Sequence, residues 1–249
     1  MSDMPGTERE RRCPPVSPVP EVRAFVPVAD SRPDDLPWPA MRWPVRAGAE
    51  LRGRVVTLRP ADPDRDAEEL YLALDHDPVW RHLAARPRDP AGWTRALRRS
   101  IDAGRLPWTV RLVREHAGLA AGTVVGASSY LDASPPDARL EIGSTAYVPA
   151  AWGTAVNPET KLLLLGYAFE ELRCGRVQLK TDVRNVRSQQ AIARLGARCE
   201  GTLRRYQRRD DDTVRDTVMF SLLAEEWPLA RRRLEARVDE LASQGPGTR

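Results

Sequence analysis

Apolar and polar side chains alternate along two stretches in the second half of the chain, and a segment with helical spacing follows each stretch. Residues 138–148 and 176–182 alternate in the manner of half-buried strands. After the first of them, apolar residues recur three or four positions apart at Leu162, Leu165, Phe169 and Leu172. After the second, Asn185 begins a further helix, and Gly196 is placed to end it as a C-terminal cap. The pattern predicts two strand-to-helix transitions about thirty residues apart.

The rest of the pattern predicts an α+β fold, with one mixed, mostly antiparallel sheet of about seven strands and about four helices. Further strands are expected at residues 53–60, 108–113, 121–131, 198–206 and 214–222, the last two forming a hairpin. Helices are expected at residues 62–73 and 90–103, with Leu70, Leu74, Trp93, Leu97 and Ile101 on their buried faces. A parallel pair of strands is expected around residues 145 and 179.

The N-terminal region differs in composition from the rest. Residues 1–50 are rich in proline and show little periodicity, so they are expected to form a largely disordered extension. Trp38 and Trp43 are unusual in a solvated tail. They leave two alternatives for residues 36–50, which either lie against the folded body or stay loose.

The remaining chain is sufficient for one domain and a C-terminal helix. Residues 51–224 form the predicted domain, and 41% hydrophobic content allows a real core. In residues 225–249, a helix at 228–242 has an apolar side and a mixed Arg/Glu side. It is expected to pack either on the core or on a second subunit, so the protein is expected to be a monomer or a homodimer.

The charge is basic without indicating a nucleic-acid partner. The net charge is +4, and only Lys161 and Lys180 among the 39 basic residues are lysines. Arginine suits phosphates and carboxylates, but no cluster is interleaved with aromatic residues as in a nucleic-acid groove. Three separated cysteines predict reduced thiols and no metal site. We expect a cytoplasmic protein without a membrane partner, because the sequence shows neither an apolar leader nor a bilayer-length apolar run.

The turn at residues 152–159 is the first candidate for chemistry. Gly153 allows a positive φ and a close approach to the backbone. The amides of residues 153–156 precede a helix, where their partial charge and the helix dipole favour an anion such as a pyrophosphate. Asn157 is expected to cap this helix, with Pro158 just inside it. The alternative is an ordinary tight turn without a ligand.

This turn and the segments after it resemble the GNAT superfamily of N-acetyltransferases, specifically the branch of the RimJ/RimL ribosomal-protein N-terminal acetyltransferases. The resemblance covers about residues 52–223 and rests on residues 152–161 (Trp-Gly-Thr-Ala-Val-Asn-Pro-Glu-Thr-Lys), 179–182, 185–189, 194–197 and 200–204. It implies a GNAT fold and acetyl-coenzyme A (acetyl-CoA) as co-substrate. It also implies transfer of the acetyl group to a primary amine by direct attack, without an acyl-enzyme.

The resemblance implies roles for individual residues. Cofactor contacts would come from Tyr147, Val148, Trp152, Gly153, Thr154, Ala155, Val156, Asn185, Arg187 and Ser188, with Arg194 as a further phosphate contact. Glu141 is the candidate base, acting through water; the alternative is a strand carboxylate paired with arginine. Ser188 is the candidate donor to the departing thiolate, although Asn185 and Ser188 are also an ordinary helix-capping pair. A backbone amide near Tyr147 or Val148 would meet the oxyanion.

The acceptor side of the site is less well defined. Trp80 and His82 lie in a segment that forms a wall of the acceptor site in the resembled fold, so they are candidates for substrate contact. The alternatives are a core tryptophan and a surface or capping histidine. The chain departs from the superfamily at Ala150, where Gln or Arg is usual before the phosphate loop.

Two questions about function remain open. An α-amine with a pKa of about 8 is neutral more often at pH 7 than a lysine amine near about 10.4, which favours a protein N-terminus as acceptor. Small-molecule amines are the other acceptor class. The alternative to an enzyme is a non-catalytic acyl-CoA-binding sensor or an interaction module that uses the proline-rich extension.

Overall fold

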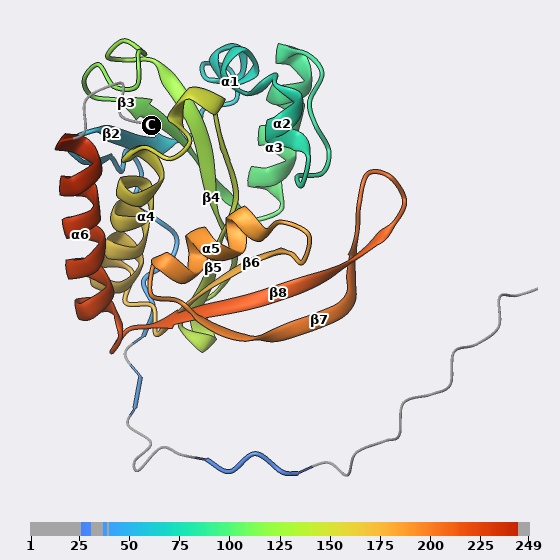
Figure 1. Ribbon diagram of the computed structural model, residues 1–249, viewed down its shortest axis with the longest axis vertical. Helices are drawn as coiled ribbons and strands as arrows, with labels where there is room; N and C mark the ends of the chain where they lie inside the picture. Colours follow the sequence, from blue (N-terminus) through green and yellow to red (C-terminus); the bar gives the residue numbers. More distant parts are fainter. Residues whose placement is uncertain (1–25, 31–36, 39, 244–249) are drawn as a thin grey trace, which may run out of the picture. The chain divides into compact units, whose positions relative to one another are not determined.

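The computed structural model describes residues 26–30, 37–38 and 40–243 (Figure 1). The chain divides into two units, Met1–Pro37 and Trp38–Arg249, and the second carries the strands and helices found in the described residues. Much of the extension predicted for residues 1–50 lies outside the described residues. The described stretch 26–30 is exposed to solvent.

One mixed sheet forms the centre of the second unit, with eight strands in the order β1-β2-β3-β4-β5-β6-β8-β7 among the described residues. The strands are β1 (Leu51–Arg52), β2 (Val56–Pro60), β3 (Leu106–Leu112), β4 (Val124–Ser134), β5 (Arg139–Tyr147), β6 (Arg176–Asp182), β7 (Arg198–Arg208) and β8 (Val214–Leu223). Neighbouring strands are antiparallel except for β5 and β6. The predicted α+β fold and the final hairpin are confirmed, and β1 is an additional strand.

β5 and β6 run parallel but pair over a short distance. Residues 139–141 lie opposite residues 176–178, and no register between the two strands follows. On its other side, β5 carries a bulge at which its register with β4 shifts, and Ser144 there has a φ of 47°. A bulge bends its strand. The parallel pair therefore lies at the start of both strands and not around residues 145 and 179, where it was predicted.

Helices cover both faces of the sheet (Figure 1). Helices α4 (Val156–Gly166), α5 (Val186–Arg194) and α6 (Trp227–Ser243) contribute side chains to the main core. Helices α1 (Ala67–Leu74), α2 (Asp77–Trp80) and α3 (Pro90–Asp102) build a smaller core on the other face. Of the two alternatives for the C-terminal helix, the structure has the one on the core, since α6 packs beside α4 and buries Leu234 and Val238.

The predicted helix faces are buried with one exception. Leu70 and Leu74 are buried in the smaller core together with Trp93 and Leu97. Ile101 was predicted to be buried and is 41% exposed. It lies in the last turn of α3, beyond Leu97, which is the last residue of that helix in the smaller core.

Residues 40–50 lie against the folded body. Met41 and Ala49 are buried in the main core. The amide of Arg42 donates to the carbonyl oxygen of Leu172 over 2.8 Å. The ring of Trp43 meets Tyr130 edge-on, with ring centroids 6.5 Å apart. Of the two alternatives for residues 36–50, the structure has the packed one from residue 40 on, whereas Trp38 is 49% exposed and residues 36 and 39 lie outside the described residues.

A buried carboxylate joins the start of the sheet to α4. Glu159 is 2% exposed and accepts hydrogen bonds from the amides of Arg54, Val55 and Val56 at 2.8, 2.7 and 2.7 Å. Glu159 lies in the first turn of α4. Its three partners, 103 to 105 residues earlier, leave no signal in the sequence.

Replacing Glu159 with Ala should destabilise the protein strongly. Three amides would lose their acceptor, and an unsatisfied buried amide costs about 1–3 kcal/mol, so we expect the free energy of unfolding to fall by at least about 3 kcal/mol. Chemical denaturation followed by circular dichroism measures this change. Glu171→Ala is the control, because Glu171 is exposed and its side chain has no hydrogen bond or ion pair in the described part of the chain. Similar small effects in both variants would contradict the role of Glu159.

Candidate active site

The turn between β5 and α4 presents free backbone amides. It begins with a 3-10 turn at Pro149–Ala151. Gly153 has a φ of 76°, and the space where a side chain would project is open. Among the described residues, the amides of Gly153 and Ala155 have no hydrogen-bond partner, and that of Val156 has only a long contact of 3.3 Å with the Thr154 hydroxyl. Free amides at a helix start are what an anion site requires.

Asn157 does not cap α4, contrary to the sequence prediction. The cap residue is Ala155, which makes no side-chain hydrogen bond, and Asn157 is the second residue inside the helix. The prediction fails because the helix begins at Val156, before the asparagine. Thr154 supplies the local contacts instead, since its hydroxyl donates to the carbonyl of Ala151 over 2.7 Å.

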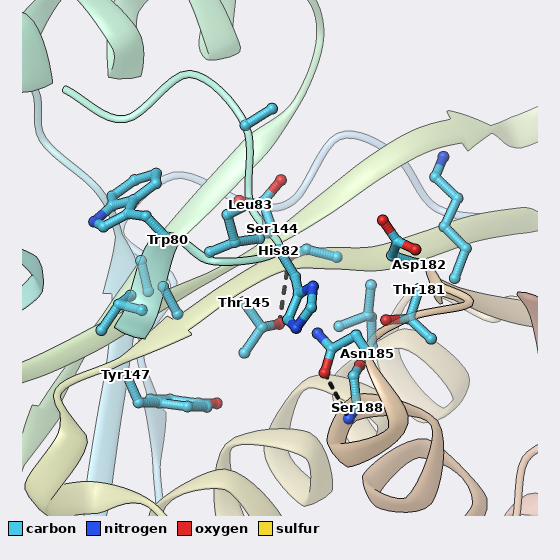
Figure 2. A pocket seen from close by; sticks show the side chains of 18 of the residues that line it. Trp80, His82, Leu83, Ser144, Thr145, Tyr147, Thr181, Asp182, Asn185 and Ser188 are labelled. Carbon is cyan, nitrogen blue, oxygen red and sulfur yellow. Dashed lines mark hydrogen bonds between the residues drawn. The ribbon is translucent and has the colours of Figure 1, made fainter. Parts of the chain in front are cut away.

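A pocket of about 1240 Å³ opens where β5 and β6 diverge, which exceeds the roughly 300–1,000 Å³ typical of small-ligand sites. Its walls come from both strands, the turn at residues 152–154, the start of α5 and the segment after α2. Figure 2 shows side chains from both strands, from the start of α5 and from the segment after α2. The predicted site residues that line it are Trp80, His82, Glu141, Tyr147, Trp152, Gly153, Thr154, Asn185, Arg187, Ser188 and Arg194. Val148, Ala155 and Val156 do not line it.

The two candidate oxyanion amides differ in their surroundings. The amide of Val148 already donates to the carbonyl of Val125 over 2.9 Å. Because successive amides of a strand point to opposite sides, the amide of Tyr147 is directed away from β4, toward the opening. The carbonyl of Tyr147 accepts a hydrogen bond from the indole of Trp152 at 2.9 Å. Tyr147 is thus the better placed of the two.

Glu141 lies where β5 and β6 part. It is 1% exposed, and its Oε2 atom accepts from Lys180 Nζ at 2.8 Å and Gln178 Nε2 at 3.1 Å. Its Oε1 atom has no hydrogen-bond partner within the described residues. A side chain at Gly143 would come within 2.8 Å of Oε1, so the glycine keeps that oxygen accessible. The ion pair that the sequence analysis gave as the alternative exists, but its cation is a lysine and not an arginine.

The start of α5 combines a helix cap with a contact to the turn at residues 152–154. Asn185 Oδ1 accepts from the amide of Ser188 at 3.1 Å, so the predicted capping pair is present (Figure 2). Arg187 stacks on the ring of Trp152, with its guanidinium carbon 3.9 Å from the ring centroid. This contact joins the two strand-to-helix transitions and holds a cation beside the turn.

Trp80 and His82 form part of the opposite wall. Trp80 donates from Nε1 to the carbonyl of Leu74 at 2.7 Å and meets Trp93 edge-on, so it belongs to the smaller core as well as to the pocket. His82 is half-buried and its imidazole points into the pocket (Figure 2). Burial lowers the pKa of His82, with the charge of Asp182 opposing the shift, so the imidazole is neutral at pH 7.

Lys161 is a polar member of the site that the sequence analysis missed. It is 5% exposed and donates from Nζ to Thr145 Oγ1 at 2.7 Å and to Ser128 Oγ at 3.0 Å. No carboxylate among the described residues pairs with it, and burial lowers its pKa to about 7. Since Thr145 follows Ser144 in the bulge, Lys161 fastens the bulged part of β5 to α4. A lysine directly before four leucines was the only signal.

Comparison with known proteins identifies the family. A model of the acetyltransferase (GNAT) domain matches residues 56–198. The chain belongs to the GNAT acetyltransferase family. As a member it is an acyltransferase, and the family uses acetyl-CoA as donor. No curated protein matches the chain.

Solved structures agree with the GNAT assignment. A protein from T. thermophilus, assigned as an acetyltransferase, is 38% identical, covers 79% of this chain and 99% of its own, and has a TM-score of 0.64. A GCN5-related N-acetyltransferase from Brucella melitensis is 25% identical, covers 85% and 96%, and has a TM-score of 0.72. RimJ from Mycobacterium smegmatis, in complex with CoA-disulfide, is similar in fold alone at 24% identity, 76% and 93% coverage and a TM-score of 0.58.

The GNAT site has groups that suit the donor of this family. Coenzyme A carries a pyrophosphate, and the turn offers free amides, open space at Gly153 and the guanidinium of Arg187. The described residues include no trio of His, Cys, Asp or Glu side chains grouped closely enough to hold a metal ion. No helix in the described ranges has the length and hydrophobicity needed to cross a membrane.

We expect Lys161 and Lys180 to lose their protons at very different pH values. With only two lysines in the chain, isotope labelling of lysine gives two side-chain NMR signals that can be followed with pH. One, absent in Lys161→Met, should titrate near pH 7. Burial works against charge on Lys180 too, but its hydrogen bond to Glu141 raises the pKa of Lys180 above the usual value. The second signal should therefore stay in the charged form up to at least about pH 10.

The same titration fixes the sign of a stability effect. Unfolded Lys161 loses its proton near about pH 10.4, so between about pH 7 and that value the unfolded state binds more protons than the folded one. The free energy of unfolding should rise with pH across this window through Lys161, and Lys161→Met should remove that contribution. Two lysine signals that both titrate above pH 10 would contradict the proposed burial of an unpaired amine.

Proposed function

We propose that this GNAT protein transfers the acetyl group of acetyl-CoA to a primary amine by direct attack within a ternary complex. The observation that carries the proposal is the divergence of β5 from β6, which opens one pocket onto both Glu141 and the turn at Gly153. A carboxylate and an anion-binding turn that share one opening suit a reaction between a phosphate-bearing donor and an amine.

In this proposal the donor is held by the two strand-to-helix transitions. The turn at residues 153–156 receives the pyrophosphate, with the unpartnered amide of Gly153 at the pocket wall and Arg187 beside it, and Asn185 orients the pantetheine arm. The part of β5 beyond Glu141 has no pairing with β6, so its edge is free to bond the amide groups of that arm as an added strand would.

The reaction needs three groups besides the donor. Glu141 Oε1 takes the proton of the amine through water. The amine nitrogen bonds to the thioester carbon, and the oxyanion meets the amide of Tyr147. The carbon–sulfur bond then breaks, Ser188 gives the thiolate a proton, and Ser188 regains a proton from solvent while Glu141 releases its own to solvent. No cysteine nucleophile is required: burial raises the pKa of Cys174 to about 12, and neither Cys174 nor Cys199 lines the pocket.

For the acceptor, we propose a protein N-terminal α-amine or a small-molecule amine, with Trp80 and His82 on the acceptor wall. A neutral His82 can accept a hydrogen bond from the amine without repelling it. The RimJ/RimL type of acceptor is supported by the sequence motifs and by the fold shared with RimJ. The lower pKa of an α-amine also suits a base that acts through water.

Gly153→Val should weaken acetyl-CoA binding by at least about tenfold, because a β-branched residue resists positive φ and would turn the amides away from the pyrophosphate. Isothermal calorimetry with acetyl-CoA measures the change in Kd. Gly118→Val is the matched control, since Gly118 has a φ of 75° and open space around it but does not line the pocket. Equal losses in both variants would mean that the glycine acts through stability and not through the donor.

Glu141→Gln should lower kcat by about a hundredfold or more while leaving the Kd for acetyl-CoA unchanged, because Gln keeps the size of the side chain and an oxygen that can accept from Lys180 but cannot take the proton of the amine. Release of free thiol from acetyl-CoA across a panel of amines and peptides measures the rate. If the wild-type protein binds acetyl-CoA but acetylates no amine, the sensor alternative is correct. If Glu141→Gln retains full kcat, another group is the base.

A further inference from the structure

Arg215 projects from the same face of the sheet as Glu141. In the register of β6 with β8, Asp182 lies opposite Thr217, and in that of β5 with β6, Glu141 lies opposite Gln178. Side chains an even number of residues apart along a strand share a face. Arg215, two residues before Thr217, is therefore on the Glu141 side, and it lines the same pocket.

Two carboxylates, Asp182 and Glu141, act on Arg215 through their charge, and each is already paired with another cation. Asp182, 2% exposed, pairs with Arg209 through two contacts of 2.6 and 3.0 Å. Burial opposes ionisation there, but the hydrogen bonds from Arg209 lower the pKa of Asp182, so the pair stays charged. Glu141 pairs with Lys180. Neither carboxylate lies within 4.0 Å of Arg215, so neither forms an ion pair with it.

The guanidinium of Arg215 is fixed at one end and free at the other. Its Nε atom donates to Thr217 Oγ1 at 3.0 Å. Its two terminal nitrogens have no hydrogen bond or ion pair within the described residues. The side chain is half-buried, and burial lowers the pKa of Arg215, which means that the cation is held where water stabilises it poorly. A guanidinium with a fixed plane and a free fork is suited to a carboxylate, which it can bind through two parallel hydrogen bonds.

We propose that Arg215 binds a carboxylate of the acceptor, so that the acceptor class is an amine carrying an acidic group. This inference rests on the proposed acetyl transfer to an amine and narrows its substrate. In the proposed function, the turn at Gly153 and the side chain of Arg187 bind the phosphates of the donor. Arg215 instead lies on β8, on the same face of the sheet as the Glu141–Lys180 pair, and is available to the acceptor. The carboxylate has two sources: the α-carboxylate of a free amino acid, or an acidic side chain next to the N-terminus of a peptide.

The test compares acceptors that differ only in this charge. Acetylation rates are measured for alanine against alaninamide, and for the N-terminal peptide pair Ala-Asp-Gly-amide against Ala-Asn-Gly-amide. The wild-type protein should prefer the acidic member of one pair by about tenfold or more in kcat/KM, and the pair that shows the preference identifies the source. Arg215→Gln should remove the preference by raising the KM of the acidic acceptor, with little change in kcat and no change in the Kd for acetyl-CoA.

Two further variants keep the result interpretable. Arg208→Gln is the matched control, because Arg208 also lines the pocket but is exposed, and within the described residues its side chain has polar contacts with Asp212 alone. It should leave the preference intact. Arg215→Lys keeps the charge without the fork and should retain part of the preference, and thermal unfolding verifies that each variant is folded.

The outcomes separate this inference from the proposed function. If the wild-type protein acetylates neutral and acidic amines equally well, the inference is overturned while acetyl transfer stands. If Arg215→Gln weakens the binding of acetyl-CoA, Arg215 belongs to the donor site and the inference is likewise wrong. If acetyl-CoA binds but no amine in either pair is acetylated, the proposed function fails and the inference fails with it.

Discussion

The site depends on one constraint of the sheet, which is that β5 and β6 pair for three residues each and then separate. Strands that separate leave backbone groups without partners, and such groups are costly unless water or a ligand satisfies them. The bulge in β5 follows soon after the paired residues and bends the strand at Ser144, which has a positive φ. What would be a defect in a continuous sheet is here the opening that a donor with its own amide groups can fill.

Helix α4 holds this opening in place, and it does so with polar groups that are unusual in a core. The turn that leads into it carries the amides without partners, Glu159 ties the helix to the β1–β2 turn, and Lys161 ties it to the bulge. Burying a lysine without a carboxylate costs stability. The protein retains this arrangement next to the proposed reaction centre, as is common where geometry matters more than stability. Helix α6 covers α4 with apolar side chains.

The patterns that predicted the fold were local ones. The alternating pattern predicted β6 with both of its ends correct, at residues 176–182. The helical spacing predicted both ends of α3 and the start of α5 to within one residue. Resemblance in the motifs identified the family before any geometry was known. The errors arose where tertiary contacts override local signals: Asn157 lost its capping role because α4 starts earlier, and the parallel pair shifted because the bulge at Ser144 has no signature in the sequence. The Glu141–Lys180 pair and the place of Arg215 could not be predicted, since both depend on strand register that pairs residues far apart in the chain. The contacts of Lys161 depend on how α4 packs against β4 and β5, which the local sequence does not specify.

The hydrogen bonds of Glu159 carry a consequence for the order in which the protein assembles. They join residues more than one hundred positions apart, and the chain between them contains β2 to β5 and the first three helices. Closing so long a loop is entropically unfavourable until the intervening strands have already brought its ends together. We therefore expect the turn at Gly153 to gain its support from Glu159 late in folding, after β2 to β5 have formed, so a nascent chain that ends at β5 should still lack the proposed donor site.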